Sequence, residues 1–238
     1  MHNDTTVSEF RKLNDAAIRY AKRSEQMFEQ QKQFIGNASH EMQTPLAVCR
    51  NRLEMLMEDE NLSEVQLGEL MKTHQTLEHI TKLNKSLLLL SKIENGQFAE
   101  TSSVEVNTLL KQYLEDYKEV YEYRGITVET HEEGTFYLTM NETLAVVLLT
   151  NLLRNAFVHN VDGGHIRIVI TPHGVTFCNT AAGQALDAER IFERFYQGQK
   201  KEGSTGLGLA IADTICKMQS INLRYYYKEG EHCFQINA

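Results

Sequence analysis

The chain has 238 residues, and its 24 basic and 32 acidic side chains give a formal net charge of −8 at pH 7. This excess of acidic groups, without a basic stripe along the chain, argues against nucleic acid as the main partner. The length allows one large domain or two smaller ones, and a content of only two prolines and fourteen glycines argues against a disordered chain.

The first predicted helix starts near Val7 and shows apolar residues in alternating steps of three and four. This spacing is a heptad seam, which is typical of a coiled coil or a helical bundle. Pro45 should kink the helix without necessarily ending it. The seam residues are Phe10, Leu13, Ala17, Tyr20, Met27, Phe34 and Ala38.

A second helix is predicted near Ser63, because Ser63 and Gln66 have the spacing of a capping box. The acidic link at 58–61 is short, and a short link places two helices side by side as an antiparallel hairpin. One hairpin cannot bury the apolar stripe of the second helix, whereas a dimer that forms a four-helix bundle can. The stripe consists of Leu67, Leu70, Leu77, Ile80, Leu83, Leu87, Leu90 and Ile93.

Residues 96–103 (GQFAETSS) have the composition of a linker. After them, helices and strands follow one another without strict βαβ alternation. This order predicts an α+β sandwich, in which helices cover one face of a sheet. The expected helices span 104–123, 142–159 and 206–219, and the expected strands span 126–130, 136–140, 165–170, 175–178, 223–227 and 234–236.

Neither a membrane span nor a secretion signal is predicted. The longest apolar run, at 87–90, is far too short to cross a bilayer, and MHNDTTVSEF lacks the charged-then-apolar order of a signal peptide. We therefore expect a soluble chain. Cys49, Cys178, Cys216 and Cys233 are far apart and form no C-x-x-C pair, so we expect reduced, mostly buried thiols in a reducing cytoplasm.

Two features of the second half point to phosphate and metal chemistry. The stretch GSTGLGLAIADTIC (203–216) places glycines at the start of a helix, where backbone N–H groups can approach a phosphate. Its spacing fits neither the dinucleotide-binding fingerprint nor a P-loop. Asn151 and Asn155 lie one turn apart, and near a phosphate turn their amide oxygens suit Mg²⁺. Taken singly, a glycine-rich turn or a buried asparagine is also common without a ligand.

Four motifs together resemble those of sensor histidine kinases. SHEMQTP (39–45) resembles the H box of that family, NLLRNAFVHN (151–160) the N box, RIFERFYQ (190–197) the F box and GSTGLGLAI (203–211) the second glycine box. They occur in the family's order and cover roughly residues 34–238. The resemblance implies a dimeric four-helix-bundle hairpin followed by an α/β-sandwich ATP-binding domain of the GHKL, or Bergerat, type.

The resemblance assigns the catalytic roles to the H box. It implies that His40 is the phosphoacceptor and that Glu41 takes up the imidazole proton. A histidine titrates near neutral pH and a neighbouring carboxylate can orient and activate it, so these assignments are chemically sound. Thr44, one turn after His40, matches the position that orients water for dephosphorylation of a partner response regulator.

The resemblance also implies a site for ATP and Mg²⁺, with Asn155 as the metal ligand. The chain departs from the family pattern where Asn179 replaces the aspartate that receives the adenine amino group, and where Val158 and Gln197 replace common basic residues. An amide oxygen can still accept that hydrogen bond. The implied nucleotide-binding residues are Asn151, Asn155, His159, Asn179, Gly183, Arg194, Lys200, Lys201, Gly206, Leu207 and Gly208.

These expectations define an ATP-dependent protein-histidine kinase that passes phosphate to an aspartate of a separate response regulator. The alternatives are a dimeric pseudokinase that only binds a regulator, and another ATPase with the same nucleotide fold. The expected parts are a signal-transmitting helix at 1–33, a phosphotransfer hairpin at 34–95, the linker at 96–103 and a catalytic domain at 104–238. The resemblance places the chain in the cytoplasm, as part of a bacterial membrane protein.

Overall fold

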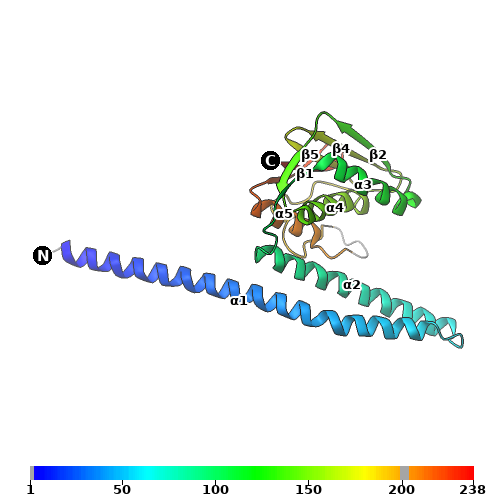
Figure 1. The fold of residues 1–238 in the computed structure, drawn as a ribbon, viewed down its shortest axis with the longest axis horizontal. Coiled ribbons are helices and arrows are strands. Elements are labelled where there is room, and N and C mark those ends of the chain that lie inside the picture. Colours follow the sequence, from blue (N-terminus) through cyan, green and yellow to red (C-terminus); the bar gives the residue numbers. More distant parts are fainter. Residues whose placement is uncertain (1–2, 199–203) are drawn as a thin grey trace.

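The computed structural model describes residues 3–198 and 204–238. Helices α1 (Asn3–Met57) and α2 (Glu64–Glu94) form an antiparallel hairpin, and the N-terminal half of α1 projects away from the rest of the chain (Figure 1). The Ser63 side chain accepts from the N–H of Gln66, and the Gln66 side chain accepts from the N–H of Ser63, so the predicted capping box is confirmed. α1 passes through Pro45 without ending. Among the described residues, no helix combines the length and apolar character that a bilayer span requires.

The second half of the chain is built on a five-stranded sheet with the order β2-β4-β5-β7-β6. β2 and β4 are parallel and the other neighbours are antiparallel. The helices lie on one face, which confirms the predicted α+β sandwich (Figure 1). The strands are β2 (Thr127–Glu132), β4 (His165–Thr171), β5 (Gly174–Thr180), β6 (Asn222–Lys228) and β7 (Glu231–Asn237), and the helices are α3 (Val106–Val120), α4 (Glu142–Val158) and α5 (Gly208–Met218).

The predicted helix at 104–123 was too long at both ends. Its first two residues belong to β1 (Ser102–Glu105), which pairs with β3 (Tyr137–Met140) in a separate two-stranded sheet and begins inside the stretch read as a linker. Val104 and its register partner Leu138 are both buried, and this pairing outweighs the local helical pattern. At the other end, α3 stops at Val120 and a short 3₁₀ turn (Glu122–Arg124) follows.

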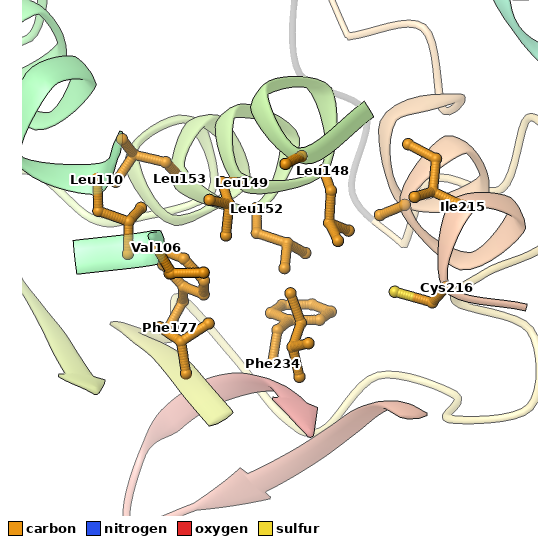
Figure 2. Packing of buried hydrophobic residues seen from close by; sticks show 14 of the residues in the cluster. Val106, Leu110, Leu148, Leu149, Leu152, Leu153, Phe177, Ile215, Cys216 and Phe234 are labelled. Carbon is orange, nitrogen blue, oxygen red and sulfur yellow. The ribbon is translucent and has the colours of Figure 1, made fainter. Parts of the chain in front are cut away.

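The core lies between α4 and the sheet. Figure 2 shows leucines of α4 packed over Phe177 of β5 and Phe234 of β7. α4 buries the side chains of Leu144, Ala145, Leu148, Leu149, Leu152, Leu153, Ala156 and Phe157. Each large apolar side chain buried in this way contributes about 1.5–3 kcal/mol, against about 1 kcal/mol for a helix cap. Packing therefore fixes the position of α4, which carries Asn151 and Asn155.

The apolar stripe of α2 is only partly available to a second chain. Leu90 and Ile93 are each 1% exposed because they join the core of their own chain. Other apolar residues of the hairpin stay exposed, and many belong to the heptad seam of α1. They include Phe10, Leu13, Tyr20, Met27, Phe34, Val65, Leu67, Met71 and Ile80.

The expectation of four reduced cysteines is wrong for two of them. Cys178 of β5 and Cys233 of β7 are bonded to each other. They are register partners in adjacent antiparallel strands, a relation that their sequence separation of 55 conceals. Cys49 and Cys216 are free, the first exposed and the second buried.

Candidate functional site

His40, Glu41 and Thr44 lie on the exposed side of α1. The preceding residue, Ser39, is buried, and its carbonyl oxygen accepts a hydrogen bond from Asn84 Nδ2 at 2.7 Å. This contact from α2 fixes the rotation of α1 at this level and leaves the imidazole of His40 accessible. Sequence reasoning missed Asn84, since nothing local shows that it faces Ser39.

A cavity lies between α4, the start of α5 and the ends of β5 and β7, and Ser86 of α2 forms part of its wall. Ser86 is two residues from Asn84, so the cavity borders α2 at a similar level along the hairpin, on the side of α2 that is turned away from α1. The predicted residues that line it are Asn151, Asn155, His159, Asn179, Gly206 and Gly208. Leu207 is fully buried instead, and the cavity wall includes Ala182 in place of its neighbour Gly183.

The glycines of the predicted phosphate turn leave room that a side chain would fill. A Cβ atom on Gly208 would lie 2.9 Å from Asn151 Oδ1, so a side chain at this position would displace the Asn151 amide. Gly206 has a φ of 68° and packs against the backbone of Phe195, whose N–H donates to the Gly206 carbonyl at 2.9 Å. The asparagine side chains of α4 and the glycines at the start of α5 thus line the same cavity. An arrangement of this kind suits a phosphate with a hard divalent cation.

Asn179 lines the cavity and is buried, at 1% exposure. Its Nδ2 donates to the carbonyl oxygen of Thr180 at 3.1 Å. Because the amide nitrogen is engaged by the main chain, Oδ1 is the side-chain atom suited to accept from an amino group.

His232 is a cavity residue that the sequence did not reveal. It is the register partner of Asn179 across β5 and β7. Tyr225 Oη lies 2.9 Å from His232 Nδ1 and accepts from the N–H of Leu186 at 2.9 Å, so its own proton is directed to the imidazole. This chain of hydrogen bonds ties the 181–190 segment to the sheet. Burial lowers the pKa of His232 below its ordinary value of 6.5.

The stability of the protein should fall at acidic pH through His232. Between pH 6.5 and the lower folded-state pKa, His232 binds a proton in the unfolded state but not in the folded state. The contribution of neutral His232 to the free energy of unfolding is therefore complete above pH 6.5 and is lost as the pH falls through the folded-state pKa. His232→Asn keeps an acceptor for Tyr225 but does not titrate. Thermal unfolding of both proteins from pH 8 to pH 5 should show a smaller pH dependence for the variant. Parallel curves would contradict a neutral, hydrogen-bonded His232.

Arg194 lies away from the cavity. Its guanidinium pairs with the Glu94 carboxylate at the end of α2, and both residues line a second cavity between the hairpin and α5. The structure therefore places Arg194 at the junction with the hairpin instead of beside Asn155. The predicted Lys200 and Lys201 lie outside the described residues.

The C-terminal end of α4 is held by Arg124, which sequence reasoning also missed. Its guanidinium donates to the carbonyl oxygens of Phe157 and Asn160, the latter at 2.7 Å, and pairs with Asp162 at 2.7 Å. A cation at this end satisfies carbonyl groups that have no partner within the helix. It thereby fixes the last turn, which carries His159 into the cavity.

Two family models match the chain. "His Kinase A (phospho-acceptor) domain" matches residues 30–96, which include α2 and the end of α1 with His40. "Histidine kinase-, DNA gyrase B-, and HSP90-like ATPase" matches residues 140–236, which include the residues that line the cavity apart from Ser86. The two matched regions thus contain the two sites described above.

Curated relatives align over most of the chain. "Heme sensor protein HssS" of Staphylococcus saprophyticus is 30% identical over 201 residues, which cover 81% of this chain and 43% of the relative. "Sensor histidine kinase RppB" of Synechocystis is 32% identical over 202 residues, which cover 80% of this chain and 44% of the relative. The chain therefore spans less than half the length of these relatives.

Solved structures share the fold of a helical hairpin followed by an α/β ATPase domain. Full-length ShkA in complex with AMPPNP gives a TM-score of 0.63 at 22% identity, over 86% of this chain and 46% of that one. Histidine kinase AdeS of Acinetobacter baumannii gives 0.56 at 20% identity, over 83% and 95%. These likenesses confirm the predicted fold class.

Proposed function

This chain belongs to the sensor histidine kinase family, and we propose that it phosphorylates its own His40 from ATP and passes the phosphoryl group to an aspartate of a separate response regulator. The observation that carries the proposal is the position of the cavity. It is lined by the asparagines of α4 and by the glycines at the start of α5, and it borders the hairpin near the level of an exposed histidine. The chain thus carries both a candidate site for the phosphates of a nucleotide and, on the neighbouring hairpin, an exposed nucleophile.

Phosphoryl transfer needs alignment and charge neutralisation more than covalent assistance. In the proposed step a ring nitrogen of His40 forms a bond to the γ-phosphorus, the bond to the bridging oxygen breaks, and ADP leaves. Glu41, the adjacent residue, takes the imidazole proton. Asn179 holds the adenine amino group through Oδ1, which fits the engagement of its Nδ2 by the main chain.

Asn155 is the proposed Mg²⁺ ligand. It is half-buried in the cavity, and the nearby Asn151 oxygen faces the start of α5, so the available donors are the oxygens that this cation prefers. The bound cation would neutralise phosphate charge. Asn151, Gly206 and Gly208 are proposed to hold the phosphates in place through their amide and backbone groups.

We also propose that the functional form is a homodimer. The exposed seam of α1, which includes Phe10 at 73% and Tyr20 at 78% exposure, is the surface expected to meet a second hairpin. We further propose that the parent protein has a sensory part and is anchored in the bacterial membrane with this chain on its cytoplasmic side. The relatives are longer than this chain, and their names describe sensors.

The assay that tests the proposed function is incubation of the chain with γ-labelled ATP and Mg²⁺. The expected product carries label that is lost in acid and survives base, as a phosphoramidate does. Label that survives acid, or none at all, would contradict the assignment of a histidine kinase.

Thr44 and Glu41 should have separable roles. Thr44→Ala is expected to keep most autophosphorylation but to slow dephosphorylation of the regulator, because Thr44 is proposed to position the attacking water. Glu41→Ala should instead lower autophosphorylation by about 10²–10⁴-fold, the range for loss of a general base. Both activities are measured with one receiver domain of the source organism. The domain chosen is the one to which the labelled kinase transfers phosphate fastest.

Gln43→Ala is the matched control for these two variants. It is an exposed residue of the same helical turn, and it should change neither activity. Circular dichroism must show equal helix content in all three variants, because Pro45 follows Thr44 directly. A Thr44→Ala protein that dephosphorylates the receiver at the wild-type rate would rule out the phosphatase role.

A further inference from the structure

The sheet carries a buried disulfide on the face that points away from the helices. Phe177 and Phe234 face α4 (Figure 2), so the next residues, Cys178 and the register-paired Cys233, point to the opposite face. Their Cα atoms are 4.1 Å apart, and the residues are 2% and 1% exposed. Within 3–198 and 204–238, no helix covers this face (Figure 1).

Two partly exposed side chains flank the bond on the neighbouring strands. Across the sheet, Arg167 is the register partner of Cys178 and Tyr226 is the register partner of Cys233. The Arg167 side chain is 40% exposed, and Tyr226 is 38% exposed. We expect rotation of these two side chains to be the route by which a small reagent reaches the sulfur atoms.

The groups around the two sulfurs favour a disulfide over a metal site. The Glu231 carboxylate lies within 4.8 Å of both sulfur atoms. Its Oε1 lies 2.7 Å from His165 Nε2, and its Oε2 pairs with Arg167. The other ring nitrogen of His165 lies 2.9 Å from Thr180 Oγ1. The carboxylate of Glu231 and the imidazole of His165 are thus already engaged as hydrogen-bond and ion-pair partners.

The disulfide adjoins the nucleotide cavity through the β5–β7 ladder. The next pair of residues along the ladder is Asn179 and His232, and both line the cavity from the helix-covered face. One further pair, Thr180 and Glu231, ends the ladder. Strand ends are the places where a sheet opens most readily. The covalent bond thus lies where it limits opening of the pair that faces the nucleotide.

We propose that Cys178 and Cys233 form a reversible thiol–disulfide site, oxidised by small-molecule disulfides, that sets the nucleotide affinity of the adjoining cavity. This inference rests on the proposed nucleotide-binding function. In the oxidation step a protein thiolate attacks the reagent disulfide and releases one reagent thiol. The second protein thiol then displaces the other reagent thiol and loses its proton. One S–S bond is reduced to two thiols while two protein thiols are oxidised to one S–S bond.

The oxidised form should bind nucleotide more tightly. In the reduced form the end of the ladder opens more often, and binding must first restore the positions of Asn179 and His232. The expected effect is a Kd about fivefold higher after reduction, within the usual range of coupling between two sites. The kcat of autophosphorylation should not change, because both cysteines lie in the sheet whereas the phosphoacceptor His40 lies on α1.

The test uses the full chain with Cys49→Ser, which removes the exposed free thiol. Cys216 can stay, because burial and, to a lesser extent, the charge of Asp213 raise the pKa of its thiol to about 12. The protein is treated with oxidised glutathione or with dithiothreitol, and mass spectrometry counts the thiols. Calorimetry then measures binding of a non-hydrolysable ATP analogue with Mg²⁺. Cys178→Ser/Cys233→Ser in the same background should bind equally after both treatments.

A redox-dependent Kd that disappears in the double variant supports the proposal. Equal affinity of the two verified redox states, or failure of oxidised glutathione to re-form the bond, overturns it. If neither state binds nucleotide, the proposed function fails, and amide hydrogen exchange decides the remaining question. Faster exchange at Asn179, Thr180, Glu231 and His232 after reduction then supports control of the ladder end by the disulfide, and unchanged exchange refutes it.

Discussion

His40→Gln should abolish phosphate labelling of the chain by γ-labelled ATP and leave nucleotide binding unchanged. Glutamine keeps the polarity of the site, but its amide nitrogen is not a nucleophile. His40 is exposed on α1, and the cavity residues belong to other elements, so the exchange should disturb neither the hairpin nor the cavity. Gel autoradiography measures the label, and calorimetry with a non-hydrolysable analogue measures binding.

His79→Gln is the matched control for this variant. His79 is also an exposed histidine of the hairpin, on α2, and it should keep full labelling. Label that persists in His40→Gln would overturn the assignment of the phosphoacceptor. Loss of label in both variants would indicate general damage to the hairpin, which circular dichroism would reveal.

Asn155→Ala should weaken binding of the Mg²⁺–nucleotide complex at least tenfold. A contact to a charged group contributes about 1.5–3 kcal/mol, and about 1.4 kcal/mol corresponds to a tenfold change in Kd. Asn155 faces the cavity from α4, whose position is fixed by its buried leucines, so neighbouring side chains cannot easily take its place. Calorimetric titration of both proteins measures the change.

Removal of Mg²⁺ separates a metal ligand from an ordinary cavity residue. With EDTA the wild type should lose affinity, whereas Asn155→Ala should change little, because it has already lost its contact with the metal. Asn151→Ala is the matched variant one turn earlier, and it should still respond to EDTA. An Asn155→Ala protein with wild-type affinity, or with an undiminished response to EDTA, would refute the metal role.

Asn179→Asp, which restores the family residue, should bind nucleotide at least as tightly as the wild type.

The sequence by itself determined the features that depend on neighbours along the chain. The capping box at Ser63 and Gln66 fixed the start of α2, and the heptad spacing of α1 predicted a helix that continues through Pro45. Local hydrogen bonds and the periodicity of apolar residues set these features, so short stretches suffice to read them. The four ordered motifs identified the family for the same reason, since each is a short run of residues.

Only the tertiary structure decided which distant residues meet. The bond between Cys178 and Cys233 depends on the register of β5 against β7. If one strand slipped by a single residue, the two cysteines would no longer lie opposite each other. Arg194 pairs with Glu94, although 100 residues separate them, because the catalytic half packs against the end of α2. Ser86 and His232 reach the cavity through the same kind of packing. Such contacts arise when whole helices and strands bury their apolar faces together, and no local pattern in the chain encodes which polar side chains that burial brings into contact.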